Sequence, residues 1–567
     1  MKLLDFRNLT IDQTKELNKL ANNNRLEFNN ILSSISSIKG IPIELFFTSI
    51  MSREPEFSPL YERCCKLAFI SDQINNEDIT SIIIKDYPLY RLLKKFISKN
   101  NLIIEISNDQ SIIEIITYYL SPIKNFIRSI SFFLFMSLAK KKSQLNNIGS
   151  KEIILISTHI LKSTSLEDLK NNYIDRNFPY LSNYIDDKDR EKIVFIPQFP
   201  GGPRPYKKIF NTLRNMEQNF IIKADYLKLK DYFYAYAYPF KLKSFSIKEV
   251  NFLNFEISSI IFSELWNSFF DYKTIEALLN IRISHRLKER GIKVRILLDW
   301  YENQISSRGL IYGFKANYPE SKIIGYQGII DSASYRINLH PTYYEKERSL
   351  VPDVVAVIGE NLIEEIKEFD DSIKVISSPT FRYNYLWKKE RKINHKEFTI
   401  LFTLPIFNDQ SQNILNLLQQ TIGSIREIKN CKVLIKPHPT KKLDGFQFNE
   451  LNQDPIISIV DGDFYSYIES TDVLVSSAST TCMEAIALGV PVAVIGAKNH
   501  ILQNPIPTNI PSNYWQLCYT KRELIKFIES IETNKKSGNV INSDDIKTNY
   551  FKMPTKENVK ELLGLSV

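Results

Sequence analysis

The chain has 567 residues, of which 43% are hydrophobic and 24% charged, and its formal net charge is +9. These values predict a folded globular protein with two or more domains. The small basic excess suits an anionic ligand or membrane surface, but no dense basic stripe indicates a nucleic-acid partner. Five scattered cysteines without a C-x-x-C pair argue against a disulfide framework or a cysteine zinc site. The first residues lack an apolar signal core, so we expect a cytoplasmic protein.

The first 150 residues show a mixed α/β pattern that ends in an apolar helical segment. Short apolar runs predict strands at Ser81–Lys85 and Leu102–Ile106, with a helix over Tyr87–Ser98 between them. Residues 109–145 are predicted to be a helical insertion, whose most apolar stretch, ISFFLFMSLA, has basic flanks. No run reaches the ~20 apolar residues that span a bilayer. Two interpretations of residues 122–142 stay open: a helix buried in the core, or one that contacts the cytoplasmic face of the inner membrane.

Strands and helices then alternate twice along the chain. The first alternation has predicted strands at Glu152–Ser157, Lys192–Pro197, Lys293–Asp299, Lys322–Tyr326, Val354–Ile358 and Lys374–Ser377. Its predicted helices are Ile247–Gly291, broken near Asp271, then Asn303–Asn317 and Glu360–Phe369. The second has predicted strands at Thr399–Thr403, Val433–Lys436, Ile456–Val460, Asp472–Ser476 and Val490–Ile495. This alternation predicts two doubly wound parallel sheets.

The predicted domain boundaries follow this division. We expect an N-terminal Rossmann-like domain over residues 1–387, which contains the helical insertion. A charged segment then leads into a second Rossmann-like domain over residues 388–548. Residues 549–567 contain a predicted helix that packs back on the first domain.

Two segments in the last third of the chain carry the strongest local signal. Lys432–Pro439 (KVLIKPHP) is an apolar strand that stops at polar residues, and Asp472–Ala497 begins with a second such strand, which opens a helix. In an open parallel sheet, ligands bind beyond the carboxyl ends of the strands. A helix N-terminus there favours a phosphate. We therefore expect a phosphate site to which Lys436 and His438 supply charge from the neighbouring strand end, with Pro439 beside them.

The second segment has more hydroxyl groups than one helix cap needs, and we expect the surplus to contact phosphate and ribose. The hydroxyl residues are Ser476, Ser477, Ser479, Thr480 and Thr481. Thr481 and Glu484 also match the T-x-x-E pattern of a capping box. Glu484 therefore has two open interpretations, a helix cap or a ligand contact.

Two carboxylates follow the predicted strand Lys293–Asp299. Asp299 and Glu302 are candidates for taking the acceptor hydroxyl proton or for acting as nucleophile. The alternative is that Asp299 caps the next helix. Gln304 and Arg308 on that helix, and Arg382 after a later strand, are candidates for lining the cleft.

These motifs resemble those of bacterial glycosyltransferases that use cytidine-activated donors. The likeness rests on the K-P-H-P strand end, the serine-rich helix start, DWYENQ at Asp299–Gln304 and SSPTFRYNYL at Ser377–Leu386. The resemblance implies a GT-B fold, with two Rossmann-like domains facing a cleft. It also implies that His438 assists departure of the nucleotide and that Glu484 holds the ribose hydroxyls. Relatives often have histidine where this chain has Gln327, so a base role there does not carry over.

The resemblance implies a transferase that moves an acidic sugar, such as Kdo or another nonulosonate, from a CMP-activated donor. The acceptor would be a surface glycan or a lipid-linked glycan. No cofactor is expected beyond the CMP-sugar substrate. No metal is expected either, since we see no D-x-D carboxylate pair near the phosphate residues. Two alternatives stay open: a CDP-glycerol or polyol-phosphate transferase, and a non-catalytic scaffold in a glycan-assembly complex. Whether transfer inverts or retains configuration stays open as well.

Overall fold

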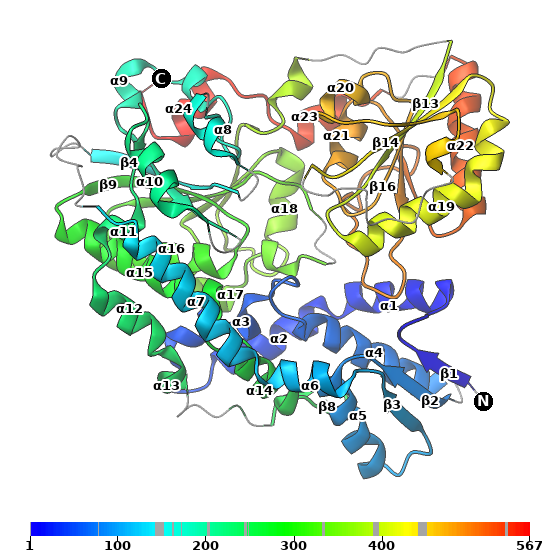
Figure 1. Cartoon of the computed structure of the whole chain (residues 1–567), viewed down its shortest axis with the longest axis horizontal. Coiled ribbons are helices and arrows are strands. Elements are labelled where there is room, and N and C mark those ends of the chain that lie inside the picture. Colours follow the sequence, from blue (N-terminus) through cyan, green and yellow to red (C-terminus); the bar gives the residue numbers. More distant parts are fainter. Residues whose placement is uncertain are drawn as a thin grey trace.

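The computed structural model describes residues 2–76, 79–141, 152–161, 164–171, 173–200, 204–242, 247, 249–331, 335–388, 396–439, 451–538 and 542–566. These residues form two large parallel sheets, a small N-terminal parallel sheet and a two-stranded hairpin. Figure 1 shows the two helix-covered halves side by side, with the N-terminal helices below both. Across the described ranges, we find no helix with the length and hydropathy that a membrane span requires.

The N-terminal region is a three-stranded parallel sheet packed with helices. Its strands are β1 (Lys2–Asp5), β2 (Ile79–Ile84) and β3 (Glu105–Asn108), in the order β1-β2-β3. Its helices are α1 (Ile11–Asn23), α2 (Arg25–Ser36), η1 (Ile43–Phe47), α3 (Ser49–Ser52), α4 (Leu60–Asn76) and α5 (Tyr87–Lys99). The predicted helix over Tyr87–Ser98 is confirmed, and Asp86 caps it by accepting a hydrogen bond from the Leu89 amide.

The predicted helical insertion is confirmed for the residues that the structure describes. It consists of α6 (Ile112–Tyr119) and α7 (Ser121–Leu138). Residues 142–145 of the prediction lie outside the described residues. One side of α7 buries Phe132, Phe133 and Met136.

The first large sheet has seven parallel strands in the order β12-β11-β10-β9-β4-β5-β6. They are β4 (Glu152–His159), β5 (Ile193–Gln198), β6 (Asn219–Phe220), β9 (Lys293–Trp300), β10 (Lys322–Gln327), β11 (Val354–Val357) and β12 (Val375–Ser377). The sequence did not predict β6, a two-residue edge strand too short to show a period. The chain runs outward from β4 to β6 and then resumes at β9 on the other side of β4.

Most helices of this half cover the sheet or connect its strands. They are α8 (Leu166–Asn171), η3 (Leu181–Tyr184), α9 (Asp187–Arg190), α10 (Tyr206–Arg214), α11 (Lys223–Tyr226), α12 (Leu229–Tyr236), α13 (Tyr238–Leu242), α14 (Ser258–Asn267), α15 (Tyr272–Glu289), α16 (Ile305–Asn317), η4 (Ile337–Leu339), α17 (Tyr343–Glu347), η5 (Glu360–Leu362), α18 (Ile363–Ile366) and η6 (Asn384–Trp387). The predicted helix from residue 247 is wrong at its start, because β7 (Asn251–Phe252) and β8 (Phe255–Glu256) form a hairpin there. Gly309 and Gly313 let α16 approach the α15 backbone so closely that a Cβ at either would clash.

The second large sheet has six parallel strands in the order β15-β14-β13-β16-β17-β18. They are β13 (Phe398–Thr403), β14 (Cys431–Lys436), β15 (Ile457–Ile459), β16 (Val473–Ser476), β17 (Val492–Ile495) and β18 (Trp515–Cys518). The helical segments are α19 (Asn408–Arg426), η7 (Leu451–Gln453), α20 (Tyr465–Ile468), α21 (Thr481–Ala487) and α22 (Lys521–Lys536). The unpredicted β18 is a half-buried edge strand with a mixed sequence, WQLC. Two doubly wound sheets facing one another confirm the predicted α/β, GT-B-like fold class.

The C-terminal segment crosses from the second half to the first. It contains α23 (Asp544–Tyr550) and α24 (Lys556–Leu562). The Lys552 amide donates to the Ile358 carbonyl at 2.6 Å, and Lys560 pairs with Asp186 at 2.8 Å. Figure 1 shows α24 beside α9 at the far side of the first half. These contacts tie the last residues of the chain to the first large sheet.

A buried ion-pair network fixes the loop that follows β9. Glu345 is fully buried and pairs with Arg53 at 2.7 Å and with Arg308 at 2.5 Å. Asn303 donates to the same carboxylate at 3.2 Å. Removing one partner of such a network leaves an uncompensated buried charge, which is strongly destabilising. Arg308 therefore holds the loop in place, and because it is buried, the prediction that it lines a cleft is wrong.

Candidate functional site

The predicted site residues gather where the strand order of each sheet reverses. In the first sheet this point lies between β4 and β9, and in the second between β13 and β16. Ligands of open α/β sheets bind beyond the carboxyl ends of the strands at such points. β13 lies between β14 and β16, so the K-P-H-P strand and the serine strand are not direct neighbours, contrary to our expectation.

Glu302 is held by three side-chain donors beside the carboxyl edge of the first sheet. Its carboxylate accepts hydrogen bonds from Arg336 Nη2 at 2.6 Å, Trp300 Nε1 at 2.8 Å and Gln304 Nε2 at 3.3 Å. Burial raises the pKa of Glu302, but the Arg336 guanidinium outweighs burial and lowers it to about 2. Glu302 is thus ionised at neutral pH, and its side chain is still 18% exposed.

Asp299 lies in the interior, near the carboxyl end of its strand. It is the seventh residue of β9, it is 1% exposed, and its register partners are Ser157 and Gly325. Burial raises the pKa of Asp299 to about 7, against hydrogen bonds with Ser157 and Ser307. Asp299 does not cap the next helix, because α16 starts at Ile305 with Gln304 in the N-cap position. Of the two predicted carboxylates, only Glu302 reaches solvent.

His159 is a candidate that the sequence analysis missed. β4 extends two residues past the predicted end at Ser157 and places His159 at the switch point of the sheet. Its Nδ1 lies 3.3 Å from Asn177 Nδ2. Burial lowers the pKa of His159, while the charge of Glu302 acts in the opposite direction. The sequence does contain a signal for His159, because polar residues at the end of a buried strand are candidates for a site. The predicted strand ended at Ser157, two residues too early, and so His159 was not considered.

Arg382 lies between the two halves. Its guanidinium carbon is 5.6 Å from the ring centroids of Trp300 and of Tyr383. Burial lowers the pKa of Arg382, but neighbouring negative charges, Glu484 and Glu302 among them, outweigh burial and raise it. Arg382 therefore connects a carboxylate of the first half with one of the second half electrostatically.

Glu484 does not form the predicted capping box. α21 begins at Thr481, its N-cap is Thr480, and no side chain caps it. Instead, the carboxylate accepts a 2.7 Å hydrogen bond from the Tyr385 hydroxyl, which comes from the first half. Burial raises the pKa of Glu484 to about 7, against the Tyr385 hydrogen bond and the charge of Arg382. The capping explanation for Glu484 is thus wrong, and its carboxylate lies between the two halves.

The hydroxyl residues divide into two groups. Ser476 and Ser477 are buried and bonded internally: Thr403 Oγ1 donates to Ser476 Oγ at 2.8 Å, and Ser477 donates to the Ile495 carbonyl at 3.1 Å. Ser479, Thr480 and Thr481 are half-buried, and the Ser479 and Thr481 hydroxyls lie 2.8 Å apart. Only the second group is accessible to a ligand. α21 has just seven residues, so its dipole is a weaker phosphate determinant than we expected.

Lys436 and His438 lie at the carboxyl end of β14. Lys436 is 7% exposed, His438 is half-buried, and Pro439 is exposed in the turn that follows. Burial lowers the pKa of Lys436, while the charges of Asp463 and Asp461 raise it. Our expectation that no D-x-D pair lies near the phosphate residues is therefore wrong, because Asp461-Gly462-Asp463 follows β15 and acts on Lys436.

Gln327 ends β10 in a buried position. It is 5% exposed, and its Oε1 has no hydrogen-bond partner among the described residues. A buried amide oxygen without a partner costs free energy and is uncommon in folded proteins. Gln327 therefore lies at the predicted edge of the sheet, and its side-chain oxygen is a hydrogen-bond acceptor that no described residue uses.

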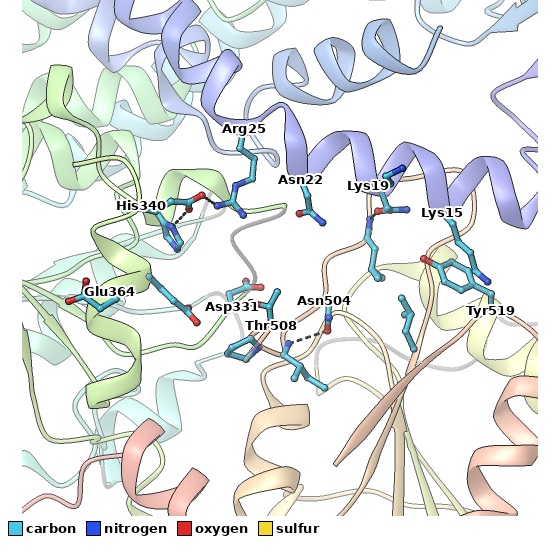
Figure 2. A pocket seen from close by; sticks show the side chains of 17 residues that line it. Lys15, Lys19, Asn22, Arg25, Asp331, His340, Glu364, Asn504, Thr508 and Tyr519 are labelled. Atoms are coloured by element: carbon cyan, nitrogen blue, oxygen red, sulfur yellow. Dashed lines mark hydrogen bonds and ion pairs between the residues drawn. The ribbon is translucent and has the colours of Figure 1, made fainter. Parts of the chain in front are cut away.

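A separate cavity of about 660 Å³ lies where α1, the first half and the second half meet. Figure 2 shows Lys15, Arg25, His340 and Tyr519 around it. Arg25 pairs with Glu368, which also lies 2.7 Å from His340 Nδ1. No predicted site residue lines this cavity, and its charges of opposite sign partly neutralise one another.

No family model matches the chain, and no curated protein matches it in sequence. Solved structures show weak similarity over most of the chain. Staphylococcus aureus MnaA in complex with UDP is 11% identical, with a TM-score of 0.44, and the match covers 73% of this chain and 98% of that one. Acinetobacter baumannii MurG is 9% identical, with a TM-score of 0.38 and coverages of 73% and 98%. A variant of the wall teichoic acid polymerase TagF is 9% identical, with a TM-score of 0.35 and coverages of 79% and 96%. Since these TM-scores are below 0.5, the fold assignment rests on the strand order described above.

Proposed function

We propose that this chain is a glycosyltransferase that moves an acidic sugar from a CMP-activated donor onto a surface glycan or a lipid-linked acceptor. The donor would bind at the second sheet, beside His438, Lys436 and the accessible hydroxyls of Ser479, Thr480 and Thr481. The acceptor would bind at the first sheet, beside Glu302 and His159. Transfer would take place between the two halves.

The position of Arg382 is the observation that carries this proposal. It follows the first sheet, stacks against Trp300, and acts electrostatically on both Glu302 and Glu484. A CMP-activated acidic sugar has two anionic groups, the phosphate and the sugar carboxylate. Lys436 and His438 suit the phosphate, and the planar guanidinium of Arg382 suits a carboxylate. The cytidine base and the sugar identity rest on the motif resemblance.

The proton of the acceptor hydroxyl has two candidate receivers, and we favour His159 assisted by Glu302. A carboxylate with a pKa of about 2 is a weak base at neutral pH. The His159 imidazole is neutral there, and the fixed negative charge of Glu302 would stabilise the imidazolium that forms. For Nε2 to take the proton, Nδ1 must carry the ring hydrogen and donate it to the Asn177 amide oxygen. A flip of that amide would place the oxygen there.

Metal independence is part of the proposal, with Lys436 and His438 compensating the phosphate charge. The carboxylates of Asp461 and Asp463 make this point open to a direct test. Removing divalent ions with a chelator should leave turnover unchanged. Loss of turnover that Mg²⁺ restores would replace this part of the proposal with a metal-assisted mechanism.

The donor is tested by incubating the protein with CMP-sugars, CDP-polyols and UDP-sugars and measuring nucleotide release. We expect release of CMP from a CMP-activated acidic sugar. Release from CDP-glycerol alone would favour the polyol-phosphate transferase, and turnover of UDP-sugars alone would overturn the cytidine assignment. Calorimetry with CMP tests the scaffold alternative, because a scaffold would show no binding at millimolar nucleotide.

A further inference from the structure

The insertion α6–α7 leaves an apolar face in solvent. Twelve large apolar side chains of residues 112–138 are exposed. They are Ile112, Ile113, Ile116, Tyr119, Leu120, Ile123, Phe126, Ile127, Ile130, Leu134, Phe135 and Leu138. We call this set the α6–α7 apolar face. Exposed apolar patches of this extent mark surfaces that contact a partner or a membrane.

The face is continuous along both helices. Ile116, Leu120, Ile123 and Ile127 recur at intervals of three and four residues, which places them on one side of a helical path. α6 has no buried residue at all, and Ile123, Ile127 and Leu138 are 59%, 62% and 70% exposed. The opposite side of α7 packs into the core through Phe132 and Met136. The apolar side chains on the exposed side of α7 therefore take no part in the core of the protein.

The charges on and beside the face are mainly positive, which favours an anionic surface. α7 has no acidic residue, whereas Lys124 and Arg128 are exposed on it and Lys140 and Lys141 follow it. In the whole of residues 112–141, Glu114 is the one carboxylate, and it pairs with Lys85 at 3.5 Å. A protein partner would require its own apolar face, but an anionic bilayer supplies both the apolar layer and the negative charge.

A cavity of about 790 Å³ adjoins the apolar face, and three cations and one carboxylate, Glu256, line it. Arg91, Lys95 and Lys99 line it from α5, four residues apart and so on one side of that helix. The exposed side chains of Phe262 and Trp266 line its other wall, and Tyr119 belongs to both the cavity and the apolar face. Arg91 Nη1 donates to the Tyr119 hydroxyl at 3.3 Å. Cations beside aromatic rings at the edge of an apolar face suit the level of lipid headgroups.

We propose that the α6–α7 apolar face inserts into the surface of an anionic phospholipid bilayer and that Arg91, Lys95 and Lys99 bind headgroup phosphates beside it. This surface lies outside the proposed catalytic cleft and does not depend on its function. Figure 1 shows α6 and α7 along the outer surface of the first half, away from the second sheet. Membrane attachment through this surface would leave the cleft between the halves free.

The test is flotation of the full-length chain with vesicles. We expect the chain to float with vesicles of phosphatidylcholine mixed with phosphatidylglycerol, and to float much less with phosphatidylcholine alone. The combined substitutions Ile123→Asp, Ile127→Asp and Leu134→Asp should lower partitioning at least about 100-fold. Met553→Asp is the matched control, an exposed apolar residue outside the face, and should leave partitioning unchanged. Circular dichroism spectra and thermal unfolding midpoints close to those of the unaltered chain would show that all variants fold.

The cations are tested separately. Lys95→Gln and Lys99→Gln should each weaken binding to anionic vesicles about fivefold, with no effect on neutral ones. Equal binding of the unaltered chain to neutral and anionic vesicles would overturn the role of charge. Absence of binding to anionic vesicles would overturn the proposal. A dimer that the triple variant abolishes, in a chain that binds no vesicle, would show that a second copy covers the face.

Discussion

The carboxyl edges of the two large sheets differ in how accessible their polar side chains are. On the first sheet the two carboxylates are enclosed by the protein itself: Glu302 has three donors, and Asp299 is buried. On the second sheet His438 and Ser479–Thr481 are half-buried and accessible. A preorganised edge is suited to act on a transition state, and an accessible edge is suited to bind and release a ligand. Four experiments test this division of roles.

The largest effect should come from Glu302→Gln. The amide keeps the shape but loses the charge that supports a protonated His159, so turnover should fall about 10²- to 10⁴-fold. Titration of CMP should give unchanged affinity, because Glu302 belongs to the other sheet. Asp299→Asn is the comparison variant, and we expect it to alter turnover far less. Equal losses in both variants would return Asp299 to the chemistry, and normal turnover in Glu302→Gln would remove Glu302 from it.

A pH effect on stability should follow from Glu484. Its pKa in the folded protein is about 7, above the ordinary 4.5, so the folded state holds this proton more tightly than the unfolded chain does. The free energy of unfolding should therefore fall as pH rises from about 4.5 to about 7, by up to about 3 kcal/mol. Denaturant titrations should show that Glu484→Gln lacks this part of the slope. A parallel pH profile in the variant and the unaltered chain would contradict the assignment.

His438→Ala tests the accessible edge. Loss of a charge-assisted hydrogen bond is worth about 1.5–3 kcal/mol, so CMP should bind about 10- to 150-fold more weakly. Calorimetry measures this directly, and turnover should fall with it. His500→Ala is a suitable control, because His500 is exposed and pairs with Asp409 at 3.3 Å. Unchanged CMP affinity in a folded His438→Ala protein would remove His438 from the donor site.

The smallest effect should come from the acidic pair beside Lys436. If that pair raises the pKa of Lys436 and binds no metal, Asp463→Asn should keep activity in the presence of a chelator. The variant removes a charge that raises the pKa of Lys436. We expect only a modest change in CMP affinity, at the high end of the pH range. Turnover that requires Mg²⁺ in the unaltered chain and is lost in Asp463→Asn would contradict this expectation.

In both sheets the sequence predicted the central strands better than the edge strands. Each predicted strand has a counterpart in the structure, because buried parallel strands are apolar runs bounded by polar residues. Lys322–Tyr326 and Thr399–Thr403, for example, match β10 and β13 to within a residue. The edge strands β6 and β18 and the hairpin β7–β8 were missed, since short or half-exposed strands have no such pattern. The motifs marked the correct edges but did not reveal which of their side chains are accessible.

The local sequence determined the order of strands and helices, the polar motifs at the strand ends and the apolar insertion. All of these depend on residues close together in the chain. Tertiary structure alone decided that Glu302 pairs with Arg336, that Tyr385 crosses to Glu484, and that Asp299 and Ser476 are closed off. Each of these outcomes depends on a partner from another element, and burial and pairing then set which groups are charged. The sequence located the candidate site, and packing between distant segments chose the side chains that can act in it.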